Sequence, residues 1–278
     1  MTKRVFNGKK YILVSLAEKN NNMQICLIGA GNLATQLAPA LAAKGHRFLQ
    51  VYSRTESSAA FLAEILDCEA VTEPELIRSD ADLYICALKD DALPTVLPLL
   101  KFGKGLLVHT AGTIPMDFLS SFTLNYGVFY PLQSFSKLRR VDFSKVPFFI
   151  EAAQPESLKL LRELASCLSE NVIPTNSDQR KQLHLAAVFA NNFVNYLYSI
   201  AEELVQEKGI DFKYLLPLIE ETANKIQTLN PVEAQTGPAV RFDHVVMDHQ
   251  LESLKNHPDW QHLYESLSRG IHERAIRQ

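Results

Sequence analysis

Short apolar runs alternate with helical patterns over the first 176 residues of the chain, and helical patterns alone follow. Apolar runs predict strands at residues 25–28, 48–52, 82–88, 106–108, 127–130, 146–151 and 172–173. Apolar residues at helical spacing predict helices at 32–44, 56–66 and 155–169, with a short helix beginning near residue 72. Strands that alternate with helices are typical of a parallel sheet with helices on both faces. The pattern predicts an α/β fold with a Rossmann-type, doubly wound and mostly parallel sheet.

The second part of the chain carries no alternation of the β type. Residues 178–208, 212–229, 243–255 and 258–276 predict helices, and residues 230–238 predict a loop. We therefore expect an N-terminal extension at 1–22, a dinucleotide-binding Rossmann domain at 23–176 and an all-helical substrate and dimerisation domain at 177–278. Met23 stands directly before the first strand, so it is a candidate for the natural start. An extra edge strand is the alternative reading of residues 1–22.

The turn after the first strand carries the G-x-G-x-x-G/A pattern, with Gly29, Gly31 and the small Ala34 in its three fixed places. Gly29 permits a tight turn, Gly31 lets a pyrophosphate approach the backbone, and Ala34 lets the helix lie close to the strand. The free N–H groups at the start of the helix then face the phosphates. The predicted cofactor contacts at this turn are Gly29, Ala30, Gly31, Asn32 and Leu33.

The second strand ends in Ser53-Arg54-Thr55. An NAD-preferring site places an acid here, which accepts a hydrogen bond from the ribose 2′-OH. The chain has two hydroxyls and an arginine instead, and a guanidinium can pair with a 2′-phosphate. This segment therefore favours NADP(H). The alternative is that Arg54 is a solvated charge and that Ser53 or Thr55 caps the next helix.

Polar residues also follow the later strands, at the edge where ligands bind in open α/β sheets. Leu88, Lys89 and Asp90 follow one strand, and Asp90 or Asp91 could equally cap a helix. His109 and Thr110 follow the next strand, and His109 could equally be a satisfied loop histidine. Gln133 and Ser134 follow the strand at 127–130 and are candidate substrate contacts.

The long helix predicted at 178–208 carries polar residues among apolar ones. His184, Asn191 and Asn195 lie within about 20° of one line at 3.6 residues per turn. One interpretation is the wall of a substrate pocket, with His184 as general acid or base. The alternative is a hydrogen-bonded helix interface or a dimer seam. Asn192 lies about 100° off this line unless a kink brings it in.

Composition excludes several classes of function. The chain has 278 residues, is 47% hydrophobic and 21% charged, and has a net charge of −3. This balance is that of a globular protein and gives no nucleic-acid footprint. No apolar run approaches the roughly 18 residues of a membrane span. The four cysteines at positions 26, 68, 86 and 167 form no C-x-x-C pair, so we expect apolar core residues, a cytoplasmic location and no metal site.

Five motifs together resemble one bacterial family. They are Ile28-Gly29-Ala30-Gly31-Asn32-Leu33-Ala34, Val51-Tyr52-Ser53-Arg54-Thr55, His109-Thr110-Ala111-Gly112, Tyr130-Pro131-Leu132-Gln133-Ser134-Phe135-Ser136 and Gln235-Thr236-Gly237-Pro238-Ala239-Val240-Arg241. The family comprises predicted oxidoreductases with a Rossmann-like first domain and a C-terminal domain of unknown function. It is related to pyrroline-5-carboxylate reductase, ketopantoate reductase and the deazaflavin-dependent NADP reductases. The resemblance covers about residues 23 to 275 and implies an NADP-type cofactor, a helical C-terminal domain and a homodimer.

The chain departs from the wider group at one point. Ketopantoate reductases carry a catalytic lysine four residues before an asparagine on the helix between the domains, whereas here Lys181 is followed at that spacing by Leu185. We therefore expect an NADP(H)-dependent oxidoreductase that acts on a small C=O or C=N compound bound between the domains, with His184 in place of the lysine. The alternatives are a non-catalytic NADP(H)-binding sensor or hydride exchange with a deazaflavin.

Overall fold

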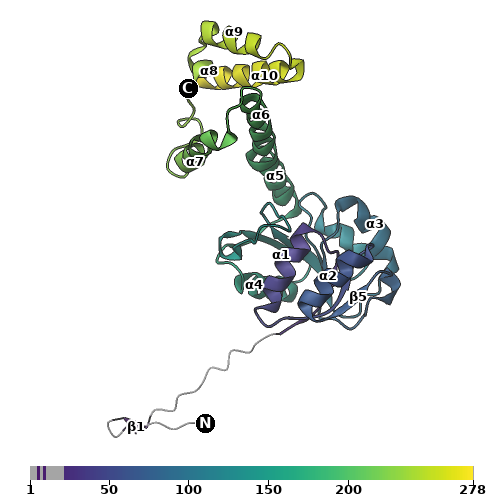
Figure 1. Ribbon diagram of the computed structural model, residues 1–278. Helices are drawn as coiled ribbons and strands as arrows, with labels where there is room; N and C mark the ends of the chain where they lie inside the picture. Colours follow the sequence, from purple (N-terminus) through teal and green to yellow (C-terminus); the bar gives the residue numbers. More distant parts are fainter. Residues whose placement is uncertain (1–4, 7–8, 11–21, 278) are drawn as a thin grey trace. The chain divides into compact units, whose positions relative to one another are not determined.

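The computed structural model describes residues 5–6, 9–10 and 22–277, and its contacts divide the chain into two compact units (Figure 1). Unit 1 is Met1–Val194 and unit 2 is Asn195–Gln278. The division falls inside the long helical stretch, whereas the predicted boundary after residue 176 marks the place where strands end and helices begin. Each unit is described by itself.

Unit 1 contains an eight-stranded sheet in the order β10-β9-β8-β7-β6-β3-β4-β5. Neighbouring strands are parallel, except that β9 runs antiparallel to β8. This sheet confirms the predicted fold class. Its strands are β3 (Gln24–Ile28), β4 (Arg47–Tyr52), β5 (Glu69–Val71), β6 (Leu83–Cys86), β7 (Leu106–His109), β8 (Tyr126–Pro131), β9 (Phe148–Ala152) and β10 (Val172–Pro174).

Two short strands lie in the predicted N-terminal extension. β1 (Val5–Phe6) and β2 (Lys9–Lys10) pair with each other and form a sheet separate from the large one. The expectation of an edge strand is therefore not met by these four residues. The other residues of 1–21 lie outside the described residues. The hypothesis that Met23 is the natural start depends on them and stays a prediction.

Helices connect the strands of unit 1. The α-helices are α1 (Asn32–Ala42), α2 (Glu56–Leu66), α3 (Leu93–Val96), α4 (Pro155–Ser166) and α5 (Ser177–Ala187). The 3₁₀ turns are η1 (Pro74–Leu76), η2 (Asp90–Ala92), η3 (Leu97–Leu99), η4 (Met116–Ser121) and η5 (Phe143–Lys145). After α5 the chain forms a π-helical segment, η6 (Val188–Phe193), which the sequence analysis did not predict.

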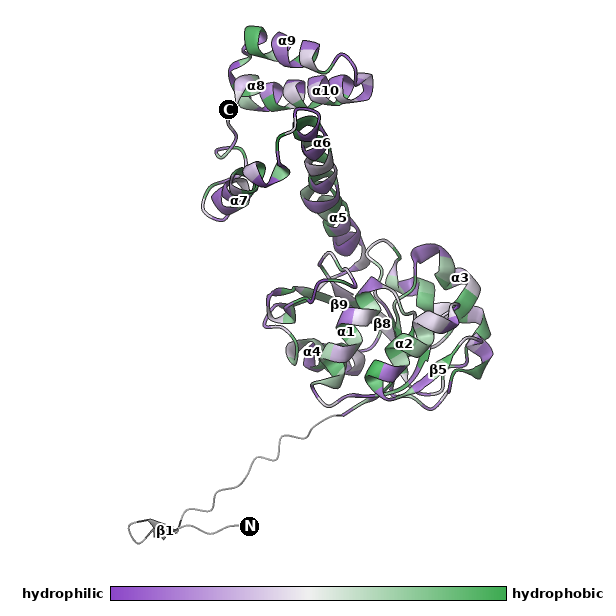
Figure 2. Cartoon of the chain, viewed as in Figure 1, coloured by the Kyte–Doolittle hydropathy of each residue, from purple (hydrophilic) through white to green (hydrophobic). Residues whose placement is uncertain are grey.

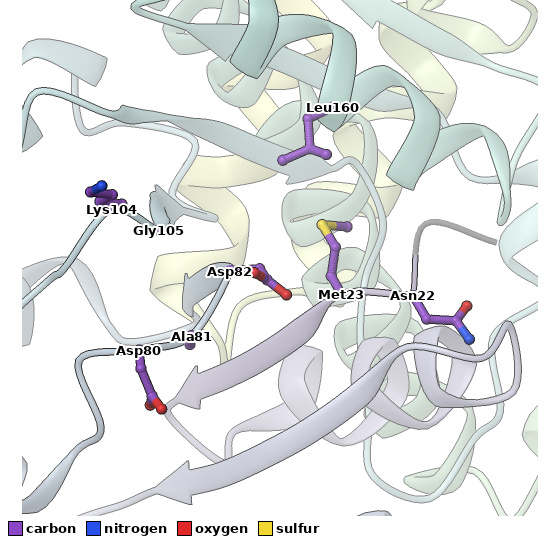
Figure 3. A pocket seen from close by; sticks show the side chains of 8 residues that line it. All are labelled: Asn22, Met23, Asp80, Ala81, Asp82, Lys104, Gly105 and Leu160. Atoms are coloured by element: carbon purple, nitrogen blue, oxygen red, sulfur yellow. The ribbon is translucent and has the colours of Figure 1, made fainter. Parts of the chain in front are cut away.

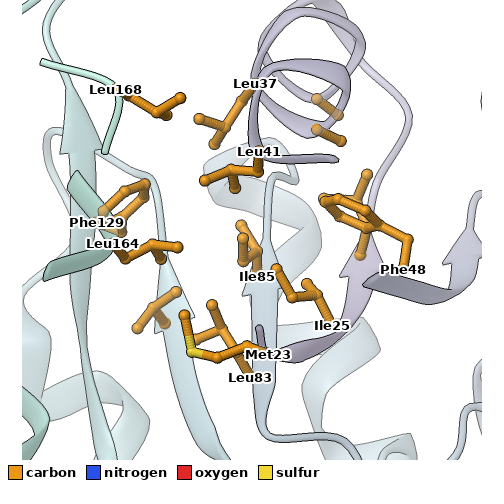
Figure 4. Close-up of a cluster of buried hydrophobic side chains, with 14 of the residues drawn as sticks. Met23, Ile25, Leu37, Leu41, Phe48, Leu83, Ile85, Phe129, Leu164 and Leu168 are labelled. Atoms are coloured by element: carbon orange, nitrogen blue, oxygen red, sulfur yellow. The ribbon is translucent and has the colours of Figure 1, made fainter. Parts of the chain in front are cut away.

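The central strands are buried on both faces, which is why they read as continuous apolar runs. In β3, Ile25 and Leu27 join one core cluster while Cys26 and Ile28 join a second one on the other face. Helices α1, α2 and α4 cover the first cluster, and Figure 4 shows several of its side chains packed between helix and sheet. Because both faces are covered, the carboxyl ends of the strands are the place where such a sheet binds its ligand.

Unit 2 is helical. Its elements are α6 (Val194–Gln206), which begins on the last residue of unit 1, η7 (Phe212–Leu215), α7 (Leu216–Lys225), α8 (Pro238–Arg241), α9 (His244–Ser253) and α10 (Pro258–Ala275). Within it, Phe242 stacks on His272 with ring centroids 4.1 Å apart. Figure 2 colours the helices of this unit by hydropathy, and both polar and apolar residues occur along them. On α7, Leu218 is 64% exposed. Within residues 22–277, no helix has the length and apolar character that crossing a bilayer requires.

Candidate active site

The glycine turn lies at the point where the strand order reverses. β3 pairs with β4 on one side and with β6 on the other, so the crevice expected at such a switch point opens above the end of β3. Gly29 has a φ of +113°, and its N–H donates to the Tyr52 carbonyl at 2.8 Å. A Cβ at Gly29 would lie 2.4 Å from the Ala87 carbonyl oxygen. Backbone conformation and close approach to the chain after β6 therefore both require glycine.

The start of α1 is open for a ligand. A Cβ at Gly31 would meet no described atom within 4 Å. Packing within the protein therefore does not require glycine at this position. The first bond within the helix runs from the Thr35 N–H to the Gly31 carbonyl at 3.0 Å. The N–H groups of Asn32, Leu33 and Ala34 therefore have no partner within the helix. No side chain caps this end and no acid lies in its first turn, so the site fits a pyrophosphate.

The segment after β4 presents its polar groups to solvent. Thr55 stands at the N-cap of α2 but its side chain makes no capping bond, and Ser53 Oγ accepts from the Thr55 N–H at 3.3 Å. Thr55 thus occupies the N-cap position that the alternative interpretation gives it, but without a side-chain capping bond. Arg54 is exposed and makes no ion pair with the described residues. Its guanidinium is thus available to an anionic group.

The segment after β6 is tied to the segment after β7. Leu88 is half-buried, and Lys89 and Asp90 are exposed. The Asp90 carboxylate accepts a short hydrogen bond from the Thr113 hydroxyl. Neither Asp90 nor Asp91 caps a helix, because Lys89 occupies the N-cap of η2 and Ala92 that of α3. The capping alternative is therefore wrong, and Asp90 instead joins two of the loops at the carboxyl edge.

The side chains of His109 and Thr110 are buried in the protein and do not line the expected cofactor crevice. The His109 side chain is fully buried, and its Nδ1 accepts from the Ala111 N–H at 3.2 Å. The neutral ring then carries its proton on Nε2, which has no hydrogen-bond partner among the described residues. Burial, and then the charge of Arg180, lower the pKa of His109 to about 3. Thr110 is buried, and its hydroxyl donates to the Cys86 carbonyl at 3.2 Å.

His184 meets a partner that the sequence analysis did not single out. The hydroxyl of Tyr130, near the end of β8, lies 2.9 Å from Nδ1 of His184 on α5. Burial raises the pKa of Tyr130, the charge of Arg180 lowers it, and that of Asp90 raises it. A Cβ at Gly112 would lie 2.4 Å from the same Nδ1, so glycine is needed there to make room for the ring. The loops after β6 and β7, the end of β8 and α5 thus converge on one site.

Arg180 fixes α5 beside this site. Its side chain is 0% exposed and forms an ion pair with Glu151 on β9, whose side chain is 14% exposed. It also donates to the Ile114 carbonyl at 2.6 Å and to the Ser177 hydroxyl at 3.3 Å. This role is hard to predict from the sequence, because an arginine on a polar helix is usually solvated. Its only signal is its place one turn before His184.

A π-helical segment interrupts the predicted line of polar residues on the long helix. The projection assumed 3.6 residues per turn from His184 to Asn195, and η6 interrupts that period at Val188–Phe193. Asn191 lies within η6 and Asn195 follows it, and both side chains are exposed. Segments of this kind occur frequently at functional sites. The interruption changes which residues share a face, so Asn192 stays open as an alternative.

Gln133 and Ser134 lie in an exposed loop after β8. The side-chain oxygen of Gln133 accepts from the Ser134 N–H at 2.7 Å, so this amide is engaged within its own loop. Gln36 on α1 holds the following residues, because its side chain donates to the Ser136 carbonyl at 2.8 Å and accepts from the Val141 N–H at 3.3 Å. The loop is therefore anchored beside the helix that carries the glycine turn.

Two cavities lined by described residues lie elsewhere. A cavity of about 650 Å³ opens at the amino edge of the sheet (Figure 3), where Met23, Asp82 and Gly105 directly precede β3, β6 and β7. A second cavity of about 550 Å³ lies between α1, α2 and residues 137–143. Neither cavity is lined by a predicted site residue. The glycine turn and the Tyr130–His184 pair both lie at the carboxyl edge of the sheet. Within residues 22–277, no cluster of three or more His, Cys, Asp or Glu side chains is arranged to hold a metal ion.

Two family models match the chain. Residues 24–111 match the model described as NADP oxidoreductase coenzyme F420-dependent, and residues 146–271 match a domain of unknown function, DUF2520. A crystal structure from Bacteroides fragilis, assigned as an NADP oxidoreductase, is 49% identical, with 91% of this chain and 99% of that chain covered and a TM-score of 0.88. The chain belongs to this NADP oxidoreductase family. The predicted family, enzyme class and NADP-type cofactor are thereby confirmed.

More distant structures share the fold of this NADP oxidoreductase. A Thermotoga maritima protein is 21% identical, covers 91% of this chain and 99% of its own, and has a TM-score of 0.76. An imine reductase from Myxococcus stipitatus, solved with NADP⁺, is 15% identical, covers 91% of this chain and 94% of its own, and has a TM-score of 0.63. The chain matches none of the curated proteins.

Proposed function

We propose that this NADP oxidoreductase transfers hydride between NADP(H) and a small C=O or C=N compound bound at the carboxyl edge of the unit 1 sheet. The observation that carries the proposal is the open glycine turn at the strand-order reversal, with the Tyr130–His184 pair at a neighbouring strand end. A bound NADPH supplies the hydride. The chain's own residues hold the cofactor, orient the substrate and manage the proton. The predicted placement of the substrate between the two domains stays a prediction.

Arg54 is proposed to bind the 2′-phosphate of the cofactor. Its support is an exposed guanidinium without an ion pair among the described residues, directly after β4. A hydrogen bond to a charged group contributes about 1.5–3 kcal/mol. Arg54→Ala should therefore weaken NADPH binding by about tenfold to a hundredfold and leave NADH binding unchanged. Calorimetric titration with both nucleotides measures this, with Arg162→Ala on the exposed face of α4 as the control.

The substrate test is the oxidation of NADPH with a panel of keto acids and imines, including pyruvate, oxaloacetate and pyrroline. Turnover of one panel compound, lost on His184→Ala, supports the proposal, in which His184 with Gln133 and Ser134 faces the substrate. A role for Asn191 and Asn195 stays a prediction. Tight NADPH binding without oxidation of any compound would contradict the proposed reaction.

A deazaflavin is the second candidate for the hydride partner. The observation that favours it is the family model that matches residues 24–111, whose description includes coenzyme F420. The match covers the part of the chain with the glycine turn and the segment after β4, where NADP(H) is proposed to bind. Mixing the protein with NADPH and oxidised F420 tests this candidate, because bleaching of the deazaflavin absorbance reports its reduction.

A homodimer formed through the helical domain and a cytoplasmic location complete the proposal. The dimer is supported by apolar side chains that face solvent along one helix, with Leu185, Phe189 and Phe193 at 50%, 62% and 48% exposure. Exposed apolar patches of this kind mark interaction sites. Light scattering of the purified protein measures the mass, and a monomer at micromolar concentration would contradict the dimer.

A further inference from the structure

We propose that Tyr130 is the proton donor of the reduction and that His184 returns the proton to it. The proposal rests on the proposed function and deepens it, because that function leaves the proton donor open. Three features of unit 1 carry the proposal: the position of Tyr130 in the sheet, the geometry of its contact with His184, and the anchoring of both side chains.

Tyr130 stands at the correct edge of the sheet. β8 is parallel to β7, β6 and β3, so its carboxyl end lies at the same edge as the glycine turn. Tyr130 is the residue before the last of this strand and is 8% exposed. The loops that end in Asp90 and Gly112 follow β6 and β7 at the same edge. The phenol therefore belongs to the group of strand ends where an open α/β sheet binds its ligand.

The contact with His184 is suited to proton transfer. The Tyr130 hydroxyl and Nδ1 of His184 are 2.9 Å apart, and the two rings meet edge to face at 66° with centroids 6.1 Å apart. This distance lies within the range that general acid–base catalysis requires. His184 is half-buried, whereas Tyr130 is nearly enclosed. In the proposal, the more exposed imidazole passes protons between solvent and the enclosed hydroxyl.

The surroundings keep the phenol protonated and the imidazole in place. Burial raises the pKa of Tyr130, so the group carries a proton to give at neutral pH. Gly112 leaves space for the His184 ring, and Arg180, one turn earlier on α5, ties the helix to Glu151 and to the Ile114 carbonyl. Arg180 is a positioning residue, because its guanidinium is fully buried and engaged with these partners.

The carbon of the C=O or C=N group accepts hydride, and its π electron pair moves to the oxygen or nitrogen. That atom takes the proton from the Tyr130 hydroxyl. The resulting phenolate takes the Nδ1 proton of an imidazolium at His184, and the neutral ring regains a proton from water. The substrate gains two electrons and two hydrogens, and the nicotinamide cofactor loses a hydride.

The first test measures the pair without a substrate. ¹⁵N NMR of the ring nitrogens, with the His184 signal assigned from the spectrum of His184→Ala, compares the wild type with Tyr130→Phe and Tyr126→Phe. Tyr126 is the matched control, because it lies on the same strand and its hydroxyl contacts Asp117 instead. We expect Tyr130→Phe alone to shift Nδ1 of His184. An unchanged signal would mean that the contact is absent in solution, and the proposal would fall while the proposed function stood.

The second test measures the reaction with the panel compound that the wild type reduces fastest. We expect Tyr130→Phe to lower kcat by about a hundredfold or more with NADPH affinity unchanged, and Tyr126→Phe to keep the wild-type rate. Added imidazole should restore part of the rate of His184→Ala and none of the rate of His184→Ala combined with Tyr130→Phe. Full activity of Tyr130→Phe would overturn the role of Tyr130 as proton donor and leave the proposed function standing. If the wild type oxidises no NADPH with any panel compound, both the proposed function and the role of Tyr130 are overturned.

Discussion

His109 gives unit 1 a pH-dependent stability whose direction and size follow from its burial. Burial, and then the charge of Arg180, lower its pKa from 6.5 to about 3, with a smaller raising effect from the backbone of Pro115. The unfolded chain binds a proton on this ring below about pH 6.5. Between these two values the unfolded state holds one proton more than the folded state. The free energy of unfolding therefore falls as the pH falls from 6.5 towards 3.

The size of this effect is large for one side chain. One pKa unit corresponds to about 1.4 kcal/mol. Between pH 7 and pH 5, protonation of His109 in the unfolded chain should remove about 2 kcal/mol of stability, since about 1.5 units separate pH 5 from the ordinary pKa. A protein domain is stable by only about 5–15 kcal/mol, so the loss is measurable.

His109→Asn isolates the contribution of this ring. The asparagine oxygen can accept from the Ala111 N–H in place of Nδ1, and it does not titrate. Native-state hydrogen exchange in urea, read on peptides from β6 and β7, measures the free energy of unfolding of unit 1 at pH 7 and pH 5. The wild type should lose about 2 kcal/mol more than the variant between these pH values. His249→Asn, which removes an exposed histidine, should behave as the wild type.

An equal loss in the wild type and in His109→Asn would refute the reasoning. It would mean that the folded protein accepts a proton on His109 as readily as the unfolded chain does. Nδ1 would then take the proton and lose the hydrogen bond that it accepts from the Ala111 N–H, or water would have to reach the ring. A lower stability of His109→Asn at pH 7 would not contradict the prediction, because the smaller side chain leaves a cavity. Only the difference between the two pH values bears on the titration.

Three further substitutions have defined outcomes. Gly29→Ala forces a positive φ on an L-residue and a clash with backbone, so it should cost about 1–3 kcal/mol or more in thermal unfolding and abolish NADPH binding in calorimetry. Gly112→Ala should displace the His184 ring and lower kcat while NADPH affinity measured by fluorescence is kept. Arg180→Met leaves Glu151 buried without its partner and should destabilise unit 1 by about 3–5 kcal/mol in urea unfolding, whereas wild-type stability would contradict the role of the pair.

The fold was predictable where local chemistry decides the conformation. The glycine turn at Gly29, the helix α2 and most strands were read correctly, because turn residues and apolar runs act over a few positions. β5 was missed because Glu69–Val71 is too short to show a pattern. α8 was read as a loop for the same reason. The antiparallel pairing of β9 was also beyond reach, since strand direction depends on how the chain returns to the sheet.

The candidate site was less predictable than the fold because its contacts are long-range. Tyr130 and His184 are separated by 54 positions, and nothing local to either residue specifies the other. Tyr130 reads as an ordinary strand aromatic, and a tyrosine in such a run is usually part of the core. His109 was expected to line the crevice because it ends β7, but strand position fixes only the edge it reaches. The burial of its side chain depends on neighbouring elements such as the one carrying Arg180.

The π-helical segment bears on which asparagine can share a face with His184. A π-helical turn takes up one residue more than an α-helical turn, which delays the following side chains by about 100°. Asn191 and Asn192 both lie inside the segment, so neither keeps the angle that a straight α-helix gives it. Asn195 follows the segment and is therefore displaced by about 100° from the predicted line. The sequence therefore identified a polar stretch correctly but could not assign its face, since a single inserted residue changes the assignment without altering the composition.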